Sequence, residues 1–140
     1  MNELATIFRW LPTVLKADAS LYAIVGDRIL GDEIPKAMAF PLVQFAYMSG
    51  RDVAGTGSVR LMTRPLFLVK VIVKGPLSSV AESAADRIDE VLQNVKYDQF
   101  GSFVFSARRE TPVAYAQGGA DAEQRYYHLG GNYRIDTQKA

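Results

Sequence analysis

The sequence predicts an α+β fold, in which a mostly antiparallel four-stranded sheet has helices packed on one face, in the order ααββαββ. Two neighbouring segments carry this prediction. Residues 66–74 are apolar on both faces of an extended strand, which is typical of a strand inside a sheet. Residues 79–95 follow a Gly-Pro break and place apolar side chains at helical spacing. Three further alternating segments predict the other strands: 42–48, 103–108 and 126–135.

Length and composition indicate one globular domain over residues 1–140. The chain is 49% hydrophobic and 22% charged, which are the values of a folded domain with its own core. Its formal net charge of +1 lacks the basic excess expected of a general nucleic-acid-binding protein. It has no cysteine and a single histidine, His128, so a zinc site or a histidine-based triad would need unusual partners. The pattern predicts neither a signal peptide nor a membrane-spanning segment.

The N-terminal residues 4–17 predict an amphipathic helix. Asn2 is a candidate N-cap, and Pro12 either kinks this helix or restarts it. Trp10 lies beside the apolar stripe. We expect it to half-cover the core rather than to anchor a partner, because amphipathic stripes usually face a core.

A second, shorter helix is predicted over residues 21–25. Asp18 or Ser20 can cap its start, and Gly26 stands where a left-handed residue ends a helix. Residues 31–35 then form a loop. Their glycine and acidic residues lack the partners of a phosphate or metal site.

The middle of the chain predicts two strands joined by a long loop. Pro41 opens the first strand, and residues 49–58 form a glycine-rich loop longer than that of a usual hairpin. Four charged residues give residues 50–64 a local charge of +2: Arg51, Asp52, Arg60 and Arg64. These residues form either a docking surface or a solvated hairpin tip, and charge alone leaves both possibilities open.

The long central strand and its helix have clear boundaries. Residues 59–63 start the strand early, and Pro65 marks an edge, a bulge or a bend because proline cannot donate to a ladder. Ser79 and Glu82 form a capping-box pattern at the start of the helix.

The C-terminal part predicts a second pair of strands. Residues 108–112, which include Arg108 and Arg109, end the first of them, and residues 113–122 form a second long loop that contains Gly118 and Gly119. The last strand is apolar on one face and polar on the other. Two adjacent glycines inside it, 130–131, indicate a bulge or a close backbone approach. Residues 136–140 read as a short mobile tail.

No group of residues predicts catalysis. His128 is expected to be a surface residue on the polar face of the last strand, without an orienting partner. Phosphate-binding, metalloprotease and serine-hydrolase motifs are absent from the sequence. No cofactor is implied. The exposed strand edges and long loops favour assembly between subunits instead.

In layout the chain resembles the tail terminator (tail completion) proteins of long-tailed bacteriophages and related particles. Four stretches carry the resemblance: the first helix followed by Ala17–Ile29, the proline-opened strand Phe40–Phe45, the long strand leading into the helix Ser79–Val95, and the closing strand Tyr126–Ile135. They span nearly the whole chain.

The resemblance implies a structural virion protein rather than an enzyme. Such proteins form a homo-oligomeric ring, usually a hexamer, on the head-proximal end of the tail tube. The ring stops tube polymerisation and offers a surface to the head–tail connector protein. DNA passes through its lumen without specific binding, and no membrane is involved. The implied location is the virion tail, assembled in the host cytoplasm.

No family motif marks the interface, so its candidates come from charge and loop position. We expect the two long loops to contact the tube protein, the connector or neighbouring subunits. The candidate residues are Arg51, Asp52, Arg60, Arg64, Arg108, Arg109, Gly118 and Gly119. The alternatives are a head–tail connector or minor tail protein, a nucleic-acid binder, and a small enzyme or ligand-binding domain. The last would need a deep pocket with convergent polar groups, which we expect to be absent.

Overall fold

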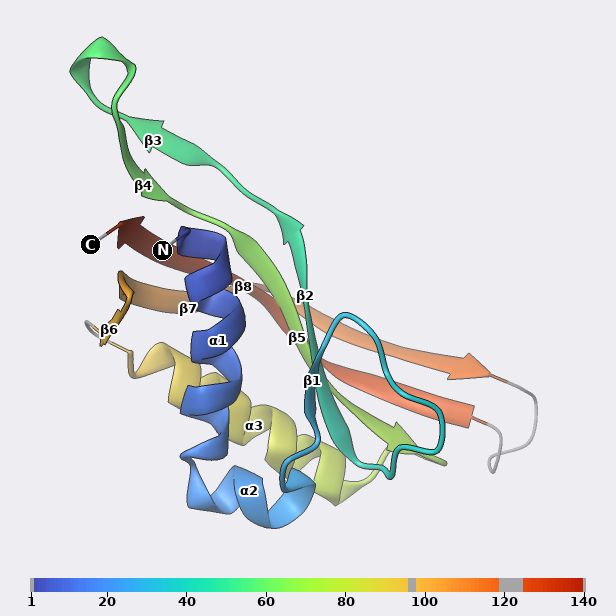
Figure 1. Ribbon diagram of the computed structural model, residues 1–140. Helices are drawn as coiled ribbons and strands as arrows, with labels where there is room; N and C mark the ends of the chain where they lie inside the picture. Colours follow the sequence, from blue (N-terminus) through green and yellow to red (C-terminus); the bar gives the residue numbers. More distant parts are fainter. Residues whose placement is uncertain (1, 96–97, 119–124, 140) are drawn as a thin grey trace.

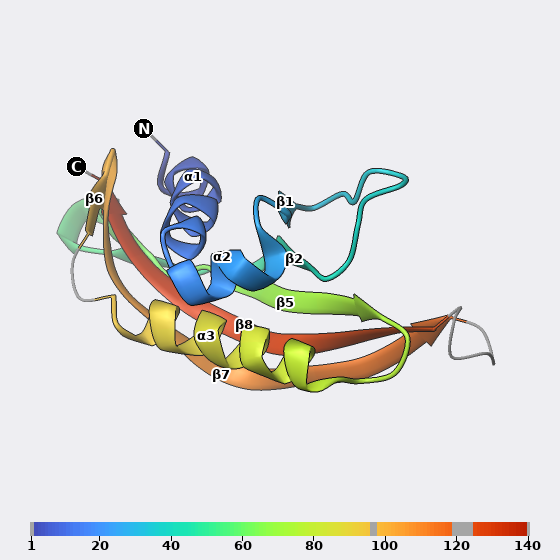
Figure 2. The ribbon, with the colours of Figure 1, turned by 90° about the horizontal axis from the view of Figure 1, so that it is seen from below.

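The computed structural model describes residues 2–95, 98–118 and 125–139. Within these residues, one eight-stranded sheet carries three α-helices on one face (Figures 1 and 2). The helices are α1 (Glu3–Lys16), α2 (Ala19–Val25) and α3 (Ser79–Gln93), with a short 3-10 helix over Thr56–Ser58. The strands are β1 (Ile29–Gly31), β2 (Leu42–Ser49), β3 (Asp52–Ala54), β4 (Arg60–Thr63), β5 (Leu66–Lys74), β6 (Asp98–Phe100), β7 (Ser102–Gly118) and β8 (Arg125–Lys139).

The sheet is mixed and larger than the sequence predicts. Its central order is β1-β2-β5-β8, with β7 on the outer side of β8 and β6 pairing with β7. Only the β1–β2 pair is parallel among the described pairs. The α+β class is therefore confirmed. The four-stranded sheet and the order ααββαββ are wrong, because three short strands and the break between β4 and β5 add to the count.

Strand β5 lies at the centre of this sheet, between β2 and β8, as its two apolar faces predicted. Phe67, Val69 and Val71 are fully buried in the core beneath the helices. Alternate residues, including Lys70 and Ile72, point to the opposite side, which we call the helix-free face. Strand β8 is the neighbour of β5 in the sheet and pairs with it over nine residues.

Helix α1 begins and ends where the sequence predicts. The Asn2 side chain accepts hydrogen bonds from the backbone of Leu4 and Ala5, and the helix continues through Pro12 without a break. Trp10 is more deeply buried than expected, with 1% of its surface exposed. Its indole Nε1 donates to Asp98 Oδ2 at 3.0 Å, so the ring joins α1 to β6.

Helices α2 and α3 are joined by an ion pair. Asp18 caps α2 by accepting from the backbone of Leu21, and Arg87 on α3 donates to the same carboxylate at 2.5 Å. The Arg87 guanidinium lowers the pKa of Asp18 below its ordinary value. The N-cap of α3 is Ser78, one residue before the predicted cap, and its hydroxyl accepts from the backbone of Ala81.

The predicted loop at residues 49–58 is largely a β-hairpin. Strands β3 and β4 pair from Asp52–Thr63 to Ala54–Arg60 and project beyond the helices as an arm (Figure 1). Within the sheet, the arm is paired with β8 at one position, Thr63 opposite Thr137. Pro65 falls between β4 and β5, so the interruption expected there is confirmed, but the predicted early start over residues 59–63 is a separate strand.

Two C-terminal predictions are wrong. Strand β7 does not end over residues 108–112 but continues through Pro112 to Gly118, so the described part of the predicted 113–122 loop is strand. Proline is tolerated there because β6 pairs only with residues 102–104, so this later part of β7 pairs with β8 alone and is an edge strand. The predicted mobile tail also extends β8, where Thr137 is fully buried and its hydroxyl donates to Phe103 O at 2.8 Å.

Candidate interaction surface

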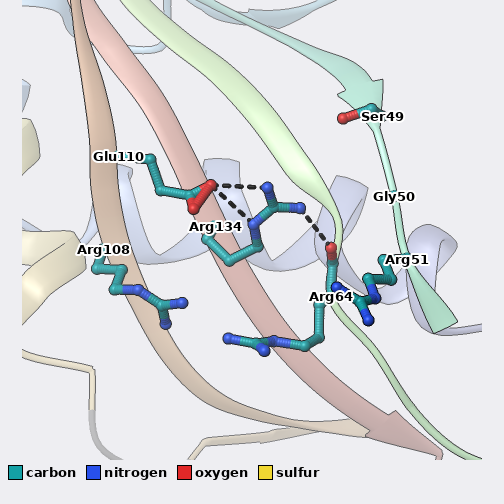
Figure 3. A pocket seen from close by; sticks show the side chains of 7 residues that line it. All are labelled: Ser49, Gly50, Arg51, Arg64, Arg108, Glu110 and Arg134. Atoms are coloured by element: carbon teal, nitrogen blue, oxygen red, sulfur yellow. Dashed lines mark hydrogen bonds and ion pairs between the residues drawn. The ribbon is translucent and has the colours of Figure 1, made fainter. Parts of the chain in front are cut away.

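A hollow rich in arginine lies on the helix-free face, where the arm joins the sheet. Its volume is about 360 Å³. Figure 3 shows its side chains in front of the strands, with the helices behind them. We call it the arginine hollow, and its lining is Ser49, Gly50, Arg51, Arg64, Arg108, Glu110 and Arg134.

Strand register brings these arginines together from distant parts of the chain. Leu66 lies opposite Arg134 on β8, and Arg134 lies opposite Arg108 on β7, so both guanidinium groups stand on the helix-free face. Arg64 and Arg51 enter from the base of the arm. The backbone N–H of Arg64 donates to the carbonyl of Arg51 at 2.7 Å and holds the two segments side by side.

Asp136 is not one of the lining residues, but it pairs with two arginines that are. Its Oδ1 accepts from Arg64 Nε at 2.9 Å, and its Oδ2 lies 3.4 Å from Arg108 Nη1. The hydroxyl of Ser106 donates to the same Oδ2 at 3.0 Å. The hydrogen bond from Arg64 to Asp136 raises the pKa of Arg64, and this charge-assisted bond holds the Arg64 guanidinium against the carboxylate.

The remaining charges leave the hollow cationic. Arg134 pairs with Glu110 at 2.7 Å and also donates to the carbonyl of Arg64 at 2.8 Å. Arg51 is exposed, and the described residues give its side chain no hydrogen bond or ion pair. Four arginines against Glu110 and Asp136 give a local charge of +2. A rigid cluster of this kind can bind an anion through its planar, bidentate donors.

The structure divides the residues predicted from charge. Arg51, Arg64 and Arg108 meet in the arginine hollow. Asp52 instead accepts a hydrogen bond from Thr63 Oγ1 at 2.9 Å across the arm. Arg109 does not line the hollow. It lies opposite Tyr133 on β8, and its side chain runs beside Gly131.

Arg60 has a structural role that sequence reasoning did not assign. It lies on β4 and pairs with Glu3 of α1 at 3.0 Å, and the Glu3 side chain is only 5% exposed. The pair therefore ties the arm to the helix layer. It stands apart from the arginine hollow.

We expect Arg60→Ala to lower the free energy of unfolding by about 1 to 2 kcal/mol, because it leaves the buried Glu3 carboxylate without its partner. Urea denaturation would measure the loss. Adding Glu3→Gln to Arg60→Ala should recover part of it, since the unpaired charge is removed. If the losses of Arg60→Ala alone and Glu3→Gln alone simply add up in the double variant, the assignment is contradicted.

Glu110, Arg134 and Asp136 were not predicted as site residues. Asp136 fell in the predicted tail, and Glu110 in a predicted strand end. Only the pairing of β7 with β8 shows that they face the same hollow. The alternation of residues 126–135 places Arg134 on the polar face, which is the one sequence signal that could have found it.

A second hollow of about 310 Å³ lies on the helix-free face and is mostly apolar. Gly118 lines it, whereas Gly119 lies outside the described residues. Its other lining residues are Ile34, Phe40, Ile72, Gln117, Tyr126 and His128.

The prediction that His128 is a surface residue is wrong. Its side chain is buried, with 6% of the residue exposed, and neither ring nitrogen has a hydrogen-bond partner in the described part of the chain. The imidazole stacks on Tyr115, with ring centroids 4.3 Å apart, and Tyr115 in turn accepts from Lys70 Nζ at 2.6 Å. Burial, with the nearby Lys70 charge, lowers the pKa of His128 to about 4.

Neither hollow assembles catalytic groups. We expected no deep pocket with convergent polar groups; the arginine hollow does gather polar groups, in a concavity of about 360 Å³. Guanidinium groups are suited to holding an anion rather than to acting as general acids or bases. Among the described residues, no three histidine, cysteine or acidic side chains are placed to hold a metal ion. No helix in those residues is long and apolar enough to cross a membrane.

A solved structure shares this fold. It is titled "Virion of native gene transfer agent (GTA) particle", and the likeness to one of its chains has a TM-score of 0.64 at 20% sequence identity. The match covers 90% of this chain and 91% of that chain. No family model and no curated protein matches the sequence. The comparison therefore extends over nearly all of both chains and concerns the fold.

Proposed function

We propose that this chain is a structural protein of a phage-type virion, and specifically a tail terminator that forms a ring on the head-proximal end of the tail tube. The observation that carries the proposal is the likeness in fold to a chain of the gene transfer agent virion over nearly the whole length of both. The sequence resemblance to tail terminators supports the finer assignment.

The surface features suit a protein that works by contact. One face of the sheet is covered by helices, the helix-free face carries two hollows, and an arm projects from the body (Figure 1). In the proposed ring these surfaces contact neighbouring subunits, the tail tube protein and the head–tail connector protein. DNA passes through the lumen without specific binding. The ring assembles in the host cytoplasm and stays in the virion tail.

Deletion of the gene, followed by electron microscopy of the particles, tests the proposal. A terminator stops tube growth and prepares the tube for joining, so its loss should give tails of abnormal length that carry no heads. Complementation with the wild-type gene is the control. Tails of normal length that fail to join heads would indicate a connector instead, and normal particles would contradict both roles.

A further inference from the structure

We propose that the arginine hollow of one copy receives the acidic outer stripe of helix α3 from a second copy, and that this contact builds the oligomer. The inference rests on the proposed function, because it names the partner of the same surface. The acidic stripe is Glu82, Asp86 and Glu90.

The acidic stripe is a line of carboxylates that can accept further hydrogen bonds. Its three residues recur every four positions on α3 and are all exposed, so they follow one side of the helix. Glu90 pairs with Arg87, but in the described part of the chain the carboxylates of Glu82 and Asp86 have no hydrogen bond or ion pair. With Asp89, the helix carries four acids against Arg87, a net charge of −3.

The two patches lie on opposite sides of the molecule. The arginine hollow is on the helix-free face, and α3 covers the other face of the sheet (Figures 2 and 3). One molecule therefore cannot bring them together. A contact between them joins the helix-free face of one copy to the helix-covered face of the next. Repetition of such a head-to-tail contact gives a ring when the rotation closes.

The chemistry of the hollow favours a carboxylate over a nucleic-acid phosphate. Among the arginines of the hollow, Arg51 is the one whose side chain has no partner within residues 2–95, 98–118 and 125–139, and one carboxylate can use both of its parallel donors. Glu110 and Asp136 already stand among the arginines and reduce the charge available to a polyanion. Nucleic-acid binding relies instead on many adjacent cationic contacts.

Charge reversal tests the contact in solution. Arg51→Glu and Asp86→Lys should each weaken association of the purified chain by at least about tenfold, measured by light scattering over a dilution series. The double variant, and a mixture of the two single variants, should both recover association, because a reversed hollow then meets a reversed stripe. Arg9→Glu and Glu33→Lys are matched reversals at exposed positions elsewhere and should change little.

Because the chain lacks cysteine, introduced thiols give a second readout. A mixture of Ser49→Cys in the hollow and Ser83→Cys beside the stripe should form a disulfide-linked dimer, whereas Ser49→Cys with Ser20→Cys on α2 should not. If the chain associates equally well in every charge-reversal variant and the Ser49→Cys and Ser83→Cys proteins form no linked dimer, this contact is overturned and the proposed ring stays intact. A chain that stays monomeric at every concentration would overturn the contact, and normal particles after gene deletion would separately overturn the terminator role. Oligonucleotide binding that is lost in Arg51→Glu, with association unchanged, would also refute the contact.

Discussion

Gly130→Ala should destabilise the protein by about 3 kcal/mol or more, the upper range for an added methyl group that a packed site cannot accommodate. A Cβ atom at this position would lie 2.2 Å from the carbonyl oxygen of Val69 and 2.6 Å from the Cα of Lys70. Both atoms belong to the backbone of β5, the central strand. Relief therefore requires β8 to move away from β5 and weakens the longest pairing of that strand.

The adjacent glycine provides the matched comparison. At Gly131 an added Cβ would meet Arg109 Cδ at 2.4 Å and the carbonyl of Thr111 at 3.0 Å. The Arg109 side chain is exposed and can rotate away, so Gly131→Ala should cost about 1 kcal/mol. Urea unfolding of both variants beside the wild type would measure the difference. A Gly130→Ala protein as stable as Gly131→Ala would show that β8 does not approach β5 so closely.

The close approach at residues 130–131 was predicted, and so were β5, α1 and the helix after β5. Each prediction rested on a pattern that is local in the sequence. Residues 66–74 are apolar on both faces of a strand, and Asn2 stands directly before an amphipathic stripe. When periodicity, cap and breaker agree within about 15 residues, tertiary context has little left to decide.

The errors arose where pairing with a distant strand overrides local preference. Pro112 and Gly118 are loop formers by themselves, yet β7 continues through Pro112 as far as Gly118 because β8 supplies a continuous partner. The short strand β1 exists because Ile29 lies opposite Val43 in parallel register, which no local pattern reveals. Short strands at the edge of a sheet are fixed by such contacts.

The arginine hollow shows the same limit for the candidate site. Charge alone pointed to Arg51, Arg64 and Arg108, and the structure brings these three together. It also pointed to Arg60, which differs from them only in its partner, the buried Glu3. A count of charges cannot separate a free guanidinium from one that ties two elements together. That distinction requires the position of the opposing carboxylate.

Acidification from pH 7 to pH 4 should destabilise the wild type by about 2 kcal/mol more than a His128→Phe variant. The pKa of His128 is lowered to about 4 in the folded chain, and the unfolded chain has the ordinary value near 6.5. Between these two values the unfolded state binds a proton that the folded state does not, so this contribution to stability is full above pH 6.5 and is lost as the pH falls towards 4. The full interval corresponds to about 3 kcal/mol, and the smaller figure allows for solvent that reaches the imidazole through the open hollow.

Phenylalanine is a suitable replacement because the imidazole already lies flat on Tyr115 and neither of its nitrogens has a partner in the described residues. At pH 7 the variant should be as stable as the wild type or slightly more so, since an unsatisfied polar group has been removed from a buried position. Carboxylates also titrate near pH 4, but they are common to both proteins, so the difference between the two curves isolates the histidine. Lys70 and Tyr115, which face the ring, are also common to both proteins. Two unfolding curves that fall in parallel from pH 7 to pH 4 would show that the imidazole is hydrated in solution.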